Sequence, residues 1–317
     1  MTLRELALEY WIPYKRRRVK ASTLSTYDTN LRTHILPVLG ERVVYDLGAE
    51  ELNDFILEQA GRGGSRADGR PLASKTVREI ALLLGQLLKF AALRGALADL
   101  SVLDELVSLS VLVPEIRTLT WEEEKRLYDC LCASPDPCAL GAIMMLYTGI
   151  RLGELCALTW RDIDLTRGTL SITKTMQRIK NLDGGGARTV VIVDRPKSPK
   201  SVRVVPLPPF LHELLHSFRS GAPGDAYFLT GEPRKFIEPR VYRSRFETYR
   251  QEARLPGEIH VHCLRHTFAT RCVELGVEVK TLSELLGHSS VQITLDRYVH
   301  SSFSKKQTEM QKLSPAG

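Results

Sequence analysis

The sequence has few cysteines, and they are not spaced as a structural metal site requires. The 317 residues contain six, namely Cys130, Cys132, Cys138, Cys156, Cys263 and Cys272. Cys130 and Cys132 form a CxC pair, but no second pair follows at zinc-finger spacing. The pattern argues against structural zinc and indicates reduced thiols of the kind found in cytosolic proteins.

Long apolar runs are also absent. No stretch approaches the roughly 20 apolar residues that are needed to cross a bilayer. The first ten residues include the charged Arg4, Glu5 and Glu9, so the start of the chain does not match a signal peptide. We find no internal repeat and no heptad array. These absences predict a soluble protein of the cytoplasm.

The composition is that of an ordinary globular protein. Hydrophobic residues make up 43% and charged residues 26%, which excludes wholesale disorder. At about 150 residues per domain, the length predicts two domains. The 44 Lys and Arg against 37 Asp and Glu give a net charge of +7. This charge favours a polyanionic partner such as nucleic acid, although many basic proteins bind none.

The chain is predicted to be mainly α, with a small antiparallel β-sheet in the second domain (α+β). Residues 1–111 read as a helical domain, with a break at Leu36–Gly40 and a long helix from Ser74 whose apolar residues recur at helical spacing. Residues 112–119 are the predicted linker. In residues 120–317, Thr120 and Glu123 match a capping box at the start of a helix. The predicted β-segments are Thr169–Thr175, Thr189–Val193 and Val202–Val205.

Two segments carry candidate anion-binding residues. Arg151 lies between Gly149 and Gly153 at a predicted helix start, where its guanidinium and free backbone N–H groups suit a phosphate. A surface ion pair with Glu154 is the simpler interpretation. His262 and Arg265 are three residues apart and share a helix face. His262 and His266 suit a metal by spacing, but no Glu lies between them and no third ligand is obvious.

A third segment contains Gly287, His288 and, ten residues further on, Tyr298. Taken alone, Gly-His after an apolar helix is a common C-cap, and a single Tyr near a C-terminus is more often a packing residue. Five of the eight histidines, however, fall between His260 and His300, in order with this Tyr and Arg265. The combination favours a site over separate structural roles.

These residues carry a family resemblance. The segments TGIRLGELCALTWRDID, HVHCLRHTFAT and LGHSSVQITLDRYVH resemble the three signature blocks of tyrosine recombinases, the phage-integrase superfamily. PKSPKSVRVVPL resembles the lysine-bearing β-hairpin of that family. The resemblance spans about residues 116–300, and the first 110 residues are similar to the core-binding domain of the family. It implies two domains that form a clamp around duplex DNA.

The resemblance also implies the site residues. Arg151 and Arg265 would clamp the scissile phosphate, and Glu154 would support the first arginine. Lys197, or less favourably Lys200, would protonate the leaving 5′ oxygen. The remaining positions would be His262 and His288, which hydrogen-bond the phosphate, and Tyr298, the nucleophile. The covalent 3′-phosphotyrosine keeps the energy of the broken bond, so no cofactor, ATP or metal is expected.

The chemistry of DNA cleavage explains this set of residues. Attack on a phosphodiester builds negative charge on oxygens that already carry one, and two guanidiniums stabilise that charge with fixed donors. A tyrosine hydroxyl has an ordinary pKa near 10, so it needs cationic surroundings or a base to become a nucleophile.

Two basic segments are the candidates for DNA contact outside the site. The first is the run Lys15, Arg16, Arg17, Arg18 and Lys20, and the second includes Arg243 and Arg245 in an aromatic stretch. A solvated helix face is an equally simple interpretation of the second. Expected partners are specific DNA sites, three further copies of the chain in a tetramer on DNA, and an accessory bending or directionality factor. The C-terminal tail, residues 303–317, would dock on a neighbouring protomer.

The biological role is less well defined by the sequence. The insertion Lys180–Arg188 is similar to that of transposon-type integrases and favours a mobile element. An invertase or a Xer-like resolvase would use the same chemistry. A type IB topoisomerase shares the tyrosine chemistry without needing two sites, and a DNA-binding regulator would not cut at all.

Overall fold

The protein folds into two compact units. The computed structural model describes residues 1–62, 71–97, 100–107, 117–183, 185–219, 221–299 and 310. One unit comprises Met1–Pro114 and Ile179–Val190, and the other Glu115–Arg178 and Val191–Gly317. Most of the predicted linker lies outside the described residues, so the domain boundaries proposed above remain predictions.

Both units are mainly helical, and strands occur only in small antiparallel sheets among the described residues, which confirms the predicted fold class. Each unit has its own apolar core. Among the residues that the structure describes, no helix is both long and apolar enough to span a bilayer.

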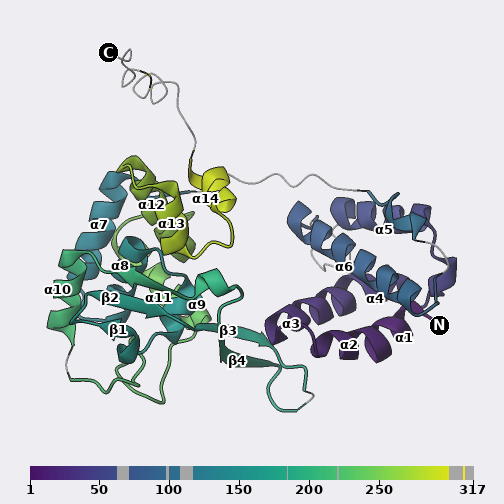
Figure 1. Ribbon diagram of the computed structural model, residues 1–317, viewed down its shortest axis with the longest axis horizontal. Helices are drawn as coiled ribbons and strands as arrows, with labels where there is room; N and C mark the ends of the chain where they lie inside the picture. The colour runs from purple at the N-terminus through teal and green to yellow at the C-terminus, as the bar shows by residue number, and fades with distance from the viewer. Residues whose placement is uncertain are drawn as a thin grey trace, which may run out of the picture. The chain divides into compact units, whose positions relative to one another are not determined.

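The first unit is built from helices around one core (Figure 1). They are α1 (Leu3–Glu5), α2 (Ile12–Arg16), α3 (Ala21–Asn30), α4 (Leu36–Leu39), α5 (Ala49–Arg62) and α6 (Ser74–Leu93). The predicted apolar stripe of α6 faces this core, with Val77, Ile80, Leu84, Leu87, Leu88 and Ala91 buried. Burial of one helix face in this way is what stabilises a helix in a small domain.

The predicted break at Leu36–Gly40 is wrong. The π-helical turn Leu31–Ile35 continues directly into α4, and Leu36 and Leu39 are buried in the core. Pro37 cannot donate an N–H to the preceding turn, and it lies where the π-helical turn changes into α4. The helical path therefore ends only at Gly40.

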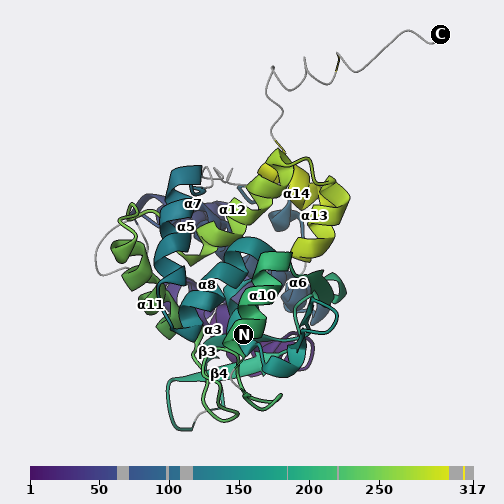
Figure 2. The same cartoon turned by 90° about the vertical axis from the view of Figure 1, so that its left-hand side faces the viewer.

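In the second unit, α8 (Pro137–Thr148) is nearly all buried and lies at the centre of the helices (Figure 2). Helices that pack against it are α7 (Trp121–Cys132), α10 (Pro209–Phe218), α11 (Pro239–Glu252), α12 (Val261–Glu274) and the short α9 (Leu152–Ala157). Helices α13 (Val279–Leu286) and α14 (Val291–Tyr298) complete the unit beside α12. The predicted capping box at the start of α7 is confirmed: the Glu123 N–H donates to Thr120 Oγ1, and the Thr120 N–H donates to Glu123 Oε2.

The strands form one sheet and one hairpin. The sheet has the order β1 (Ile163–Asp164), β2 (Thr169–Ile172) and β5 (Arg203–Pro206), with Leu170 opposite Val205. The hairpin consists of β3 (Thr175–Lys180) and β4 (Thr189–Asp194). The predicted single segment Thr169–Thr175 is therefore divided, because β2 ends at Ile172 and Thr175 already belongs to the hairpin.

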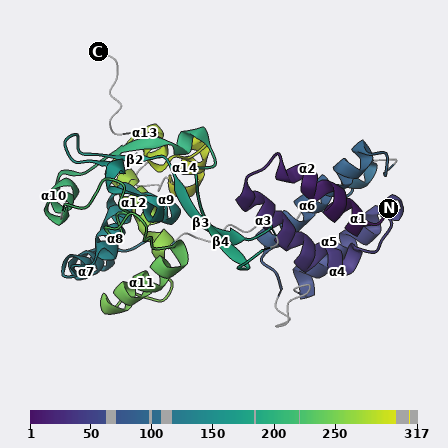
Figure 3. The ribbon, with the colours of Figure 1, turned by 90° about the horizontal axis from the view of Figure 1, so that it is seen from below.

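The tip of the hairpin belongs to the first unit. The Lys180 ammonium lies 2.5 Å from Asp28 Oδ2, and the Lys180 N–H donates to Ser25 Oγ at 3.0 Å. Both partners lie on α3, and Figure 3 shows this helix next to the end of the hairpin that belongs to the first unit. The predicted insertion Lys180–Arg188 is thus the connection between β3 and β4, and its first residue is bonded to the helical unit.

Gly149 supports a specific prediction about stability. It ends α8 in a left-handed conformation, with φ of 65°, and an added Cβ would collide with the ring of Phe268. We expect Gly149→Ala to lower the free energy of unfolding of the second unit by about 2 kcal/mol or more, from backbone strain plus the collision. Urea unfolding measures this change.

Gly257→Ala is the matched control. Gly257 is exposed, has no atom near the position of an added Cβ, and does not have a positive φ. The free energy of unfolding of the Gly257→Ala variant should differ from that of the unchanged protein by less than about 0.5 kcal/mol. Equal stabilities of the two variants would contradict the assignment of Gly149 as a constrained cap.

Candidate active site

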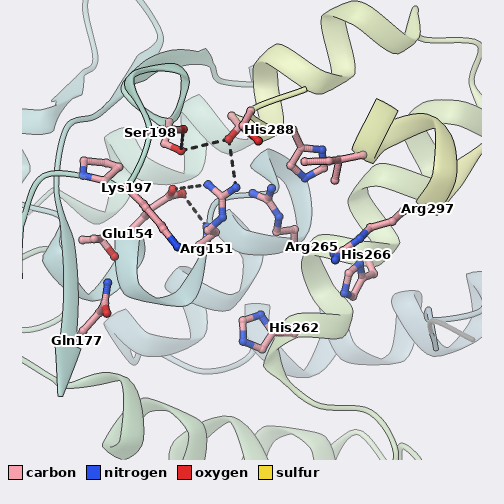
Figure 4. Close-up of a pocket in the computed structure, with 16 residues that line it drawn as sticks. Arg151, Glu154, Gln177, Lys197, Ser198, His262, Arg265, His266, His288 and Arg297 are labelled. Atoms are coloured by element: carbon pink, nitrogen blue, oxygen red, sulfur yellow. Dashed lines mark hydrogen bonds and ion pairs between the residues drawn. The ribbon is translucent and has the colours of Figure 1, made fainter. Parts of the chain in front are cut away.

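The predicted site residues meet at one cavity of about 740 Å³ in the second unit (Figure 4). Its lining includes six of the predicted residues, Arg151, Glu154, Lys197, His262, Arg265 and His288. They come from α9, the β4–β5 connection, α12 and the turn after α13. Tyr298, the predicted nucleophile, lies at the end of α14, outside the cavity lining.

The two arginines are fixed by carbonyl groups at helix ends. Arg265 is 6% exposed, and its guanidinium donates to Gly149 O at 2.5 Å and to Leu286 O at 2.8 Å. Arg151, the N-cap of α9, donates to Gly287 O at 3.2 Å. A guanidinium has five N–H donors, so each of these keeps donors for a ligand in the cavity.

Glu154, in the cavity lining, joins Arg151 to a further arginine, Arg203. Its carboxylate, 2% exposed, accepts from the Arg151 guanidinium at 2.9 Å, from the Arg151 backbone N–H at 2.8 Å, and from two nitrogens of Arg203 at 2.9 and 3.1 Å. Burial alone would raise the pKa of Glu154, but the bonds from Arg203 and Arg151 lower it overall.

The charges of this cluster do not cancel. Arg151 and Arg203 form ion pairs with the carboxylate of Glu154, and Arg265 interacts with it electrostatically, so three guanidiniums and one carboxylate leave two net positive charges. Burial, reinforced by Arg151, lowers the pKa of Arg265 to about 9, so this guanidinium is still charged at neutral pH. A cationic cluster with spare N–H donors facing a cavity is suited to bind an anion.

The structure separates the two candidate lysines. Lys197 lines the cavity. The Lys200 ammonium instead donates to the carbonyl of Ser289 at 3.1 Å. This difference favours Lys197 as the lysine that reaches a bound anion.

The histidines around the cavity are held in the neutral form. Burial, aided by Arg265, Arg151 and other nearby cations, lowers the pKa of His288 to about 3. Its Nδ1 is 2.8 Å from Thr294 Oγ1. Desolvation in the cavity wall and the charge of Arg243 also lower the pKa of His262. Neutral imidazoles can both accept and donate hydrogen bonds.

Tyr298 is buried, at 8% exposed, and its hydroxyl lies 2.7 Å from Nδ1 of His266. Its ring is nearly parallel to that of His288, with the centroids 6.4 Å apart. Burial raises the pKa of Tyr298, although Arg265 and Arg297 act in the opposite direction.

Sequence reasoning does not reveal the roles of three residues. Arg203 lies in the segment that resembles the family's hairpin, but nothing in that segment indicates a bond to Glu154, 49 positions away. His266 suggests only a metal ligand with His262 by its spacing, yet it contacts Tyr298. Arg297 lines the cavity. Its position directly before Tyr298 in the sequence is the feature that could have indicated this role.

The metal interpretation of His262 and His266 gains no support. Within the ranges that the structure describes, no three His, Cys, Asp or Glu side chains come together in a metal-binding arrangement.

The basic run at the start of the chain is largely solvent-exposed. Lys15 bonds Gln86 and lies over the Trp11 ring, and Arg16 bonds Asp183 in the hairpin tip. Arg17 and Arg18 are exposed, the latter stacked on Tyr14.

The second basic segment lies on α11. Arg243 is exposed near His262. The Arg245 guanidinium is 3.4 Å from both Asp136 Oδ2 and Cys138 Sγ, so this predicted DNA contact is engaged within the unit.

Known families match both halves of the chain. The phage integrase family matches residues 117–305, and the N-terminal SAM-like domain of phage integrases matches residues 2–58. A tyrosine recombinase XerC-like protein of Caldanaerobacter subterraneus is 28% identical, over 72% of this chain and 63% of its own length. The tyrosine recombinase XerA of Thermococcus kodakarensis is 29% identical, over 56% of each chain. The chain thus spans less than two thirds of the length of these two relatives.

Solved structures share the fold. The Tn1549 transposon integrase in complex with a circular intermediate DNA superposes with a TM-score of 0.78 and 21% identity, over 99% of this chain and 100% of that one. A lambda integrase dimer bound to a core site superposes with a TM-score of 0.66 and 18% identity, over 96% of this chain and 100% of that one.

The buried histidine at position 288 predicts a pH dependence of stability. Its pKa is about 3 when folded and about 6.5 when unfolded. Below pH 6.5 the unfolded chain therefore binds a proton that the folded chain does not, and stability falls as the pH falls. Urea unfolding measures the loss of stability between pH 6.5 and pH 5.0. We expect this loss to be about 1–2 kcal/mol smaller in His288→Gln than in the unchanged protein.

His216→Gln serves as the control, because His216 is exposed on α10. This variant should keep the original slope of stability against pH. A His288→Gln variant with that same slope would show that His288 is not held neutral by the fold.

Proposed function

The chain belongs to the phage integrase family, and we propose that it is a site-specific DNA recombinase that cuts and rejoins strands through a covalent 3′-phosphotyrosine. The observation that carries this proposal is the cationic cluster of Arg151, Arg203 and Arg265 around Glu154. Its net positive charge and its spare N–H donors face the cavity and match a phosphodiester.

The mechanism follows from the side chains around the cavity. Arg151 and Arg265 bind the non-bridging oxygens of the scissile phosphate and stabilise the charge that grows on them during attack. Tyr298 supplies the nucleophilic oxygen, and Lys197 protonates the leaving 5′ oxygen. His262 and His288 hydrogen-bond the phosphate and assist proton transfer. The phosphotyrosine conserves the bond energy, so rejoining uses no ATP and no metal.

The proposed partner is double-stranded DNA, which the two units would enclose as a clamp in the cytoplasm. Lys15, Arg16, Arg17, Arg18, Lys20 and Arg243 are the proposed phosphate contacts outside the cavity. Arg245 is a weaker candidate because of its bond to Asp136. A tetramer on DNA is supported by the lambda integrase tetramer bound to a Holliday junction, and an accessory bending or directionality factor completes the proposed assembly. Nearly all of the tail, residues 303–317, lies outside the described residues.

A mobile element is the proposed setting. The likeness in fold to the Tn1549 transposon integrase supports it, as does the insertion Lys180–Arg188 between β3 and β4. An invertase or a Xer-like resolvase would use the same site and differs only in where its two DNA sites lie. A DNA-binding regulator that does not cut is the alternative from another class.

Tyr298→Phe tests the proposed chemistry. We expect this variant to form no SDS-resistant adduct with nicked suicide duplexes drawn from the DNA that flanks the gene, because the attacking oxygen is missing. Binding to the same duplexes should be nearly unchanged. The original protein should form the adduct without metal or nucleotide. A Tyr298→Phe protein that retains full biological function without forming any adduct would favour the regulator.

The exposed part of the basic run gives a test of DNA contact. Changing Arg17 and Arg18 together to Gln should reduce the slope of log binding constant against log salt by about 0.9 for each phosphate that the protein no longer neutralises. The drop in affinity should be similar for specific and unrelated duplexes, because phosphate contacts do not read sequence. Lys125→Gln, at an exposed residue of α7 paired with Asp129, is the control. An unchanged slope in the double variant would remove Arg17 and Arg18 from the proposed interface.

A further inference from the structure

The hydroxyl of Tyr298 has a specific partner that the predicted catalytic set does not include. Nδ1 of His266 on α12 lies 2.7 Å from Tyr298 Oη on α14. The two rings are 5.8 Å apart between centroids and tilted by 43°. His266 lines the cavity and Tyr298 does not, so the hydroxyl lies one side chain away from the cavity. Figure 4 shows His266 beside Arg297.

The direction of this hydrogen bond follows from the charges around it. The cations that face His266 are Arg265 on its own helix and Arg297 on α14, and His260 and His262 are also close. Burial, together with these groups, lowers the pKa of His266 to about 4, so the ring is neutral at pH 7. The charges of Arg265 and Arg297 also favour loss of the Tyr298 proton, because they lower the pKa of the hydroxyl. A neutral His266 ring that carries its proton on Nε2 presents a lone pair at Nδ1, and the Tyr298 hydroxyl donates its proton to that lone pair.

The other histidine near Tyr298 is not placed for this role. His288 stacks on the tyrosine ring, and its Nδ1 contacts Thr294 Oγ1 at 2.8 Å. Among the described residues, the side chain that hydrogen-bonds Tyr298 Oη is His266, and its imidazole can take up a proton, which the guanidinium of the nearby Arg297 cannot.

We propose that His266 is a catalytic residue that accepts the phenolic proton when Tyr298 attacks the DNA. This inference rests on the proposed function. Oη forms a bond to phosphorus, its proton moves to Nδ1 of His266, the bond from phosphorus to the 5′ oxygen breaks, and that oxygen takes a proton from the Lys197 ammonium. In rejoining, the 5′ hydroxyl attacks and returns its proton to Lys197, while the departing Tyr298 oxygen recovers the proton held by His266.

The test compares His266→Phe and His266→Gln with the original full-length protein. Phe removes the acceptor, whereas Gln offers an oxygen that can hold the hydroxyl but cannot take up its proton. The rate of adduct formation is measured from pH 6 to 10 on nicked suicide duplexes. It is measured again on duplexes with a bridging sulfur at the 5′ position, whose thiolate leaves without a proton. His216→Phe, at an exposed position of α10, is the control.

We expect both His266 variants to bind DNA normally and to form adduct about 100-fold more slowly at pH 7, within the range for a general base. Their rates should rise about tenfold per pH unit, because hydroxide replaces the missing base, and should approach the original rate at high pH. The bridging sulfur should not restore the rate of adduct formation of the His266 variants. It should largely restore the rate of Lys197→Ala, because that variant lacks only the proton donor to the leaving 5′ oxygen.

Three results would overturn the inference while leaving the proposed function intact. The first is a His266→Gln protein that forms adduct as fast as the unchanged protein, and the second is a rescue of both His266 variants by the bridging sulfur. The third is faster adduct formation by His266→Phe, which would mean that the hydrogen bond restrains Tyr298. If the His266→Phe protein does not fold, His266→Gln carries the test alone. An original protein that forms no adduct on any duplex, while still binding DNA, would instead overturn the proposed function and this inference together.

Discussion

The buried carboxylate of Glu154 is the interaction on which the site depends. Moving a carboxylate out of water costs several kcal/mol, and here four hydrogen bonds from Arg151 and Arg203 offset that cost. In return, the negative charge allows three arginines to remain close together in the absence of DNA. Without it, Arg151, Arg203 and Arg265 would repel one another with no counterion. Glu154 therefore makes the anion site possible without occupying it.

The same cluster depends on two helix ends. Gly149 and Gly287 both adopt left-handed conformations, with φ of 65° and 63°, and end α8 and α13. The last carbonyls of a helix lack partners within it and carry partial negative charge. Here those carbonyls accept from guanidiniums: Gly149 O and Leu286 O from Arg265, Gly287 O from Arg151, and Leu285 O from Arg203. The arginines are thus oriented by the fold before any ligand arrives.

The sequence predicts features that depend on residues close together in the chain, and site residues that occur in a recognisable order along it. The capping box of Thr120 and Glu123 and the apolar stripe of α6 depend on neighbours three or four positions apart, and the structure confirms both. The continuous helix through Leu36 is not predicted, because the π-turn before Pro37 leaves no pattern in the sequence. The bonds of Glu154 to Arg203 and of His266 to Tyr298 span 49 and 32 positions. Such contacts arise only when separate elements pack, so no periodicity indicates them.

If the chain acts as proposed, the electrostatics of the site also couple DNA binding to proton transfer. Burial and the arginines lower the pKa of His262, His266 and His288 together, so all three are neutral while the cavity is open to water. A phosphate that enters brings negative charge next to Arg151 and Arg265 and offsets part of the field that the histidines experience. Their pKa values then rise, and each imidazole becomes a better proton acceptor. A phosphate substrate of the proposed kind would therefore raise the basicity of the groups around it. In its absence the same histidines are uncharged, which is compatible with their burial.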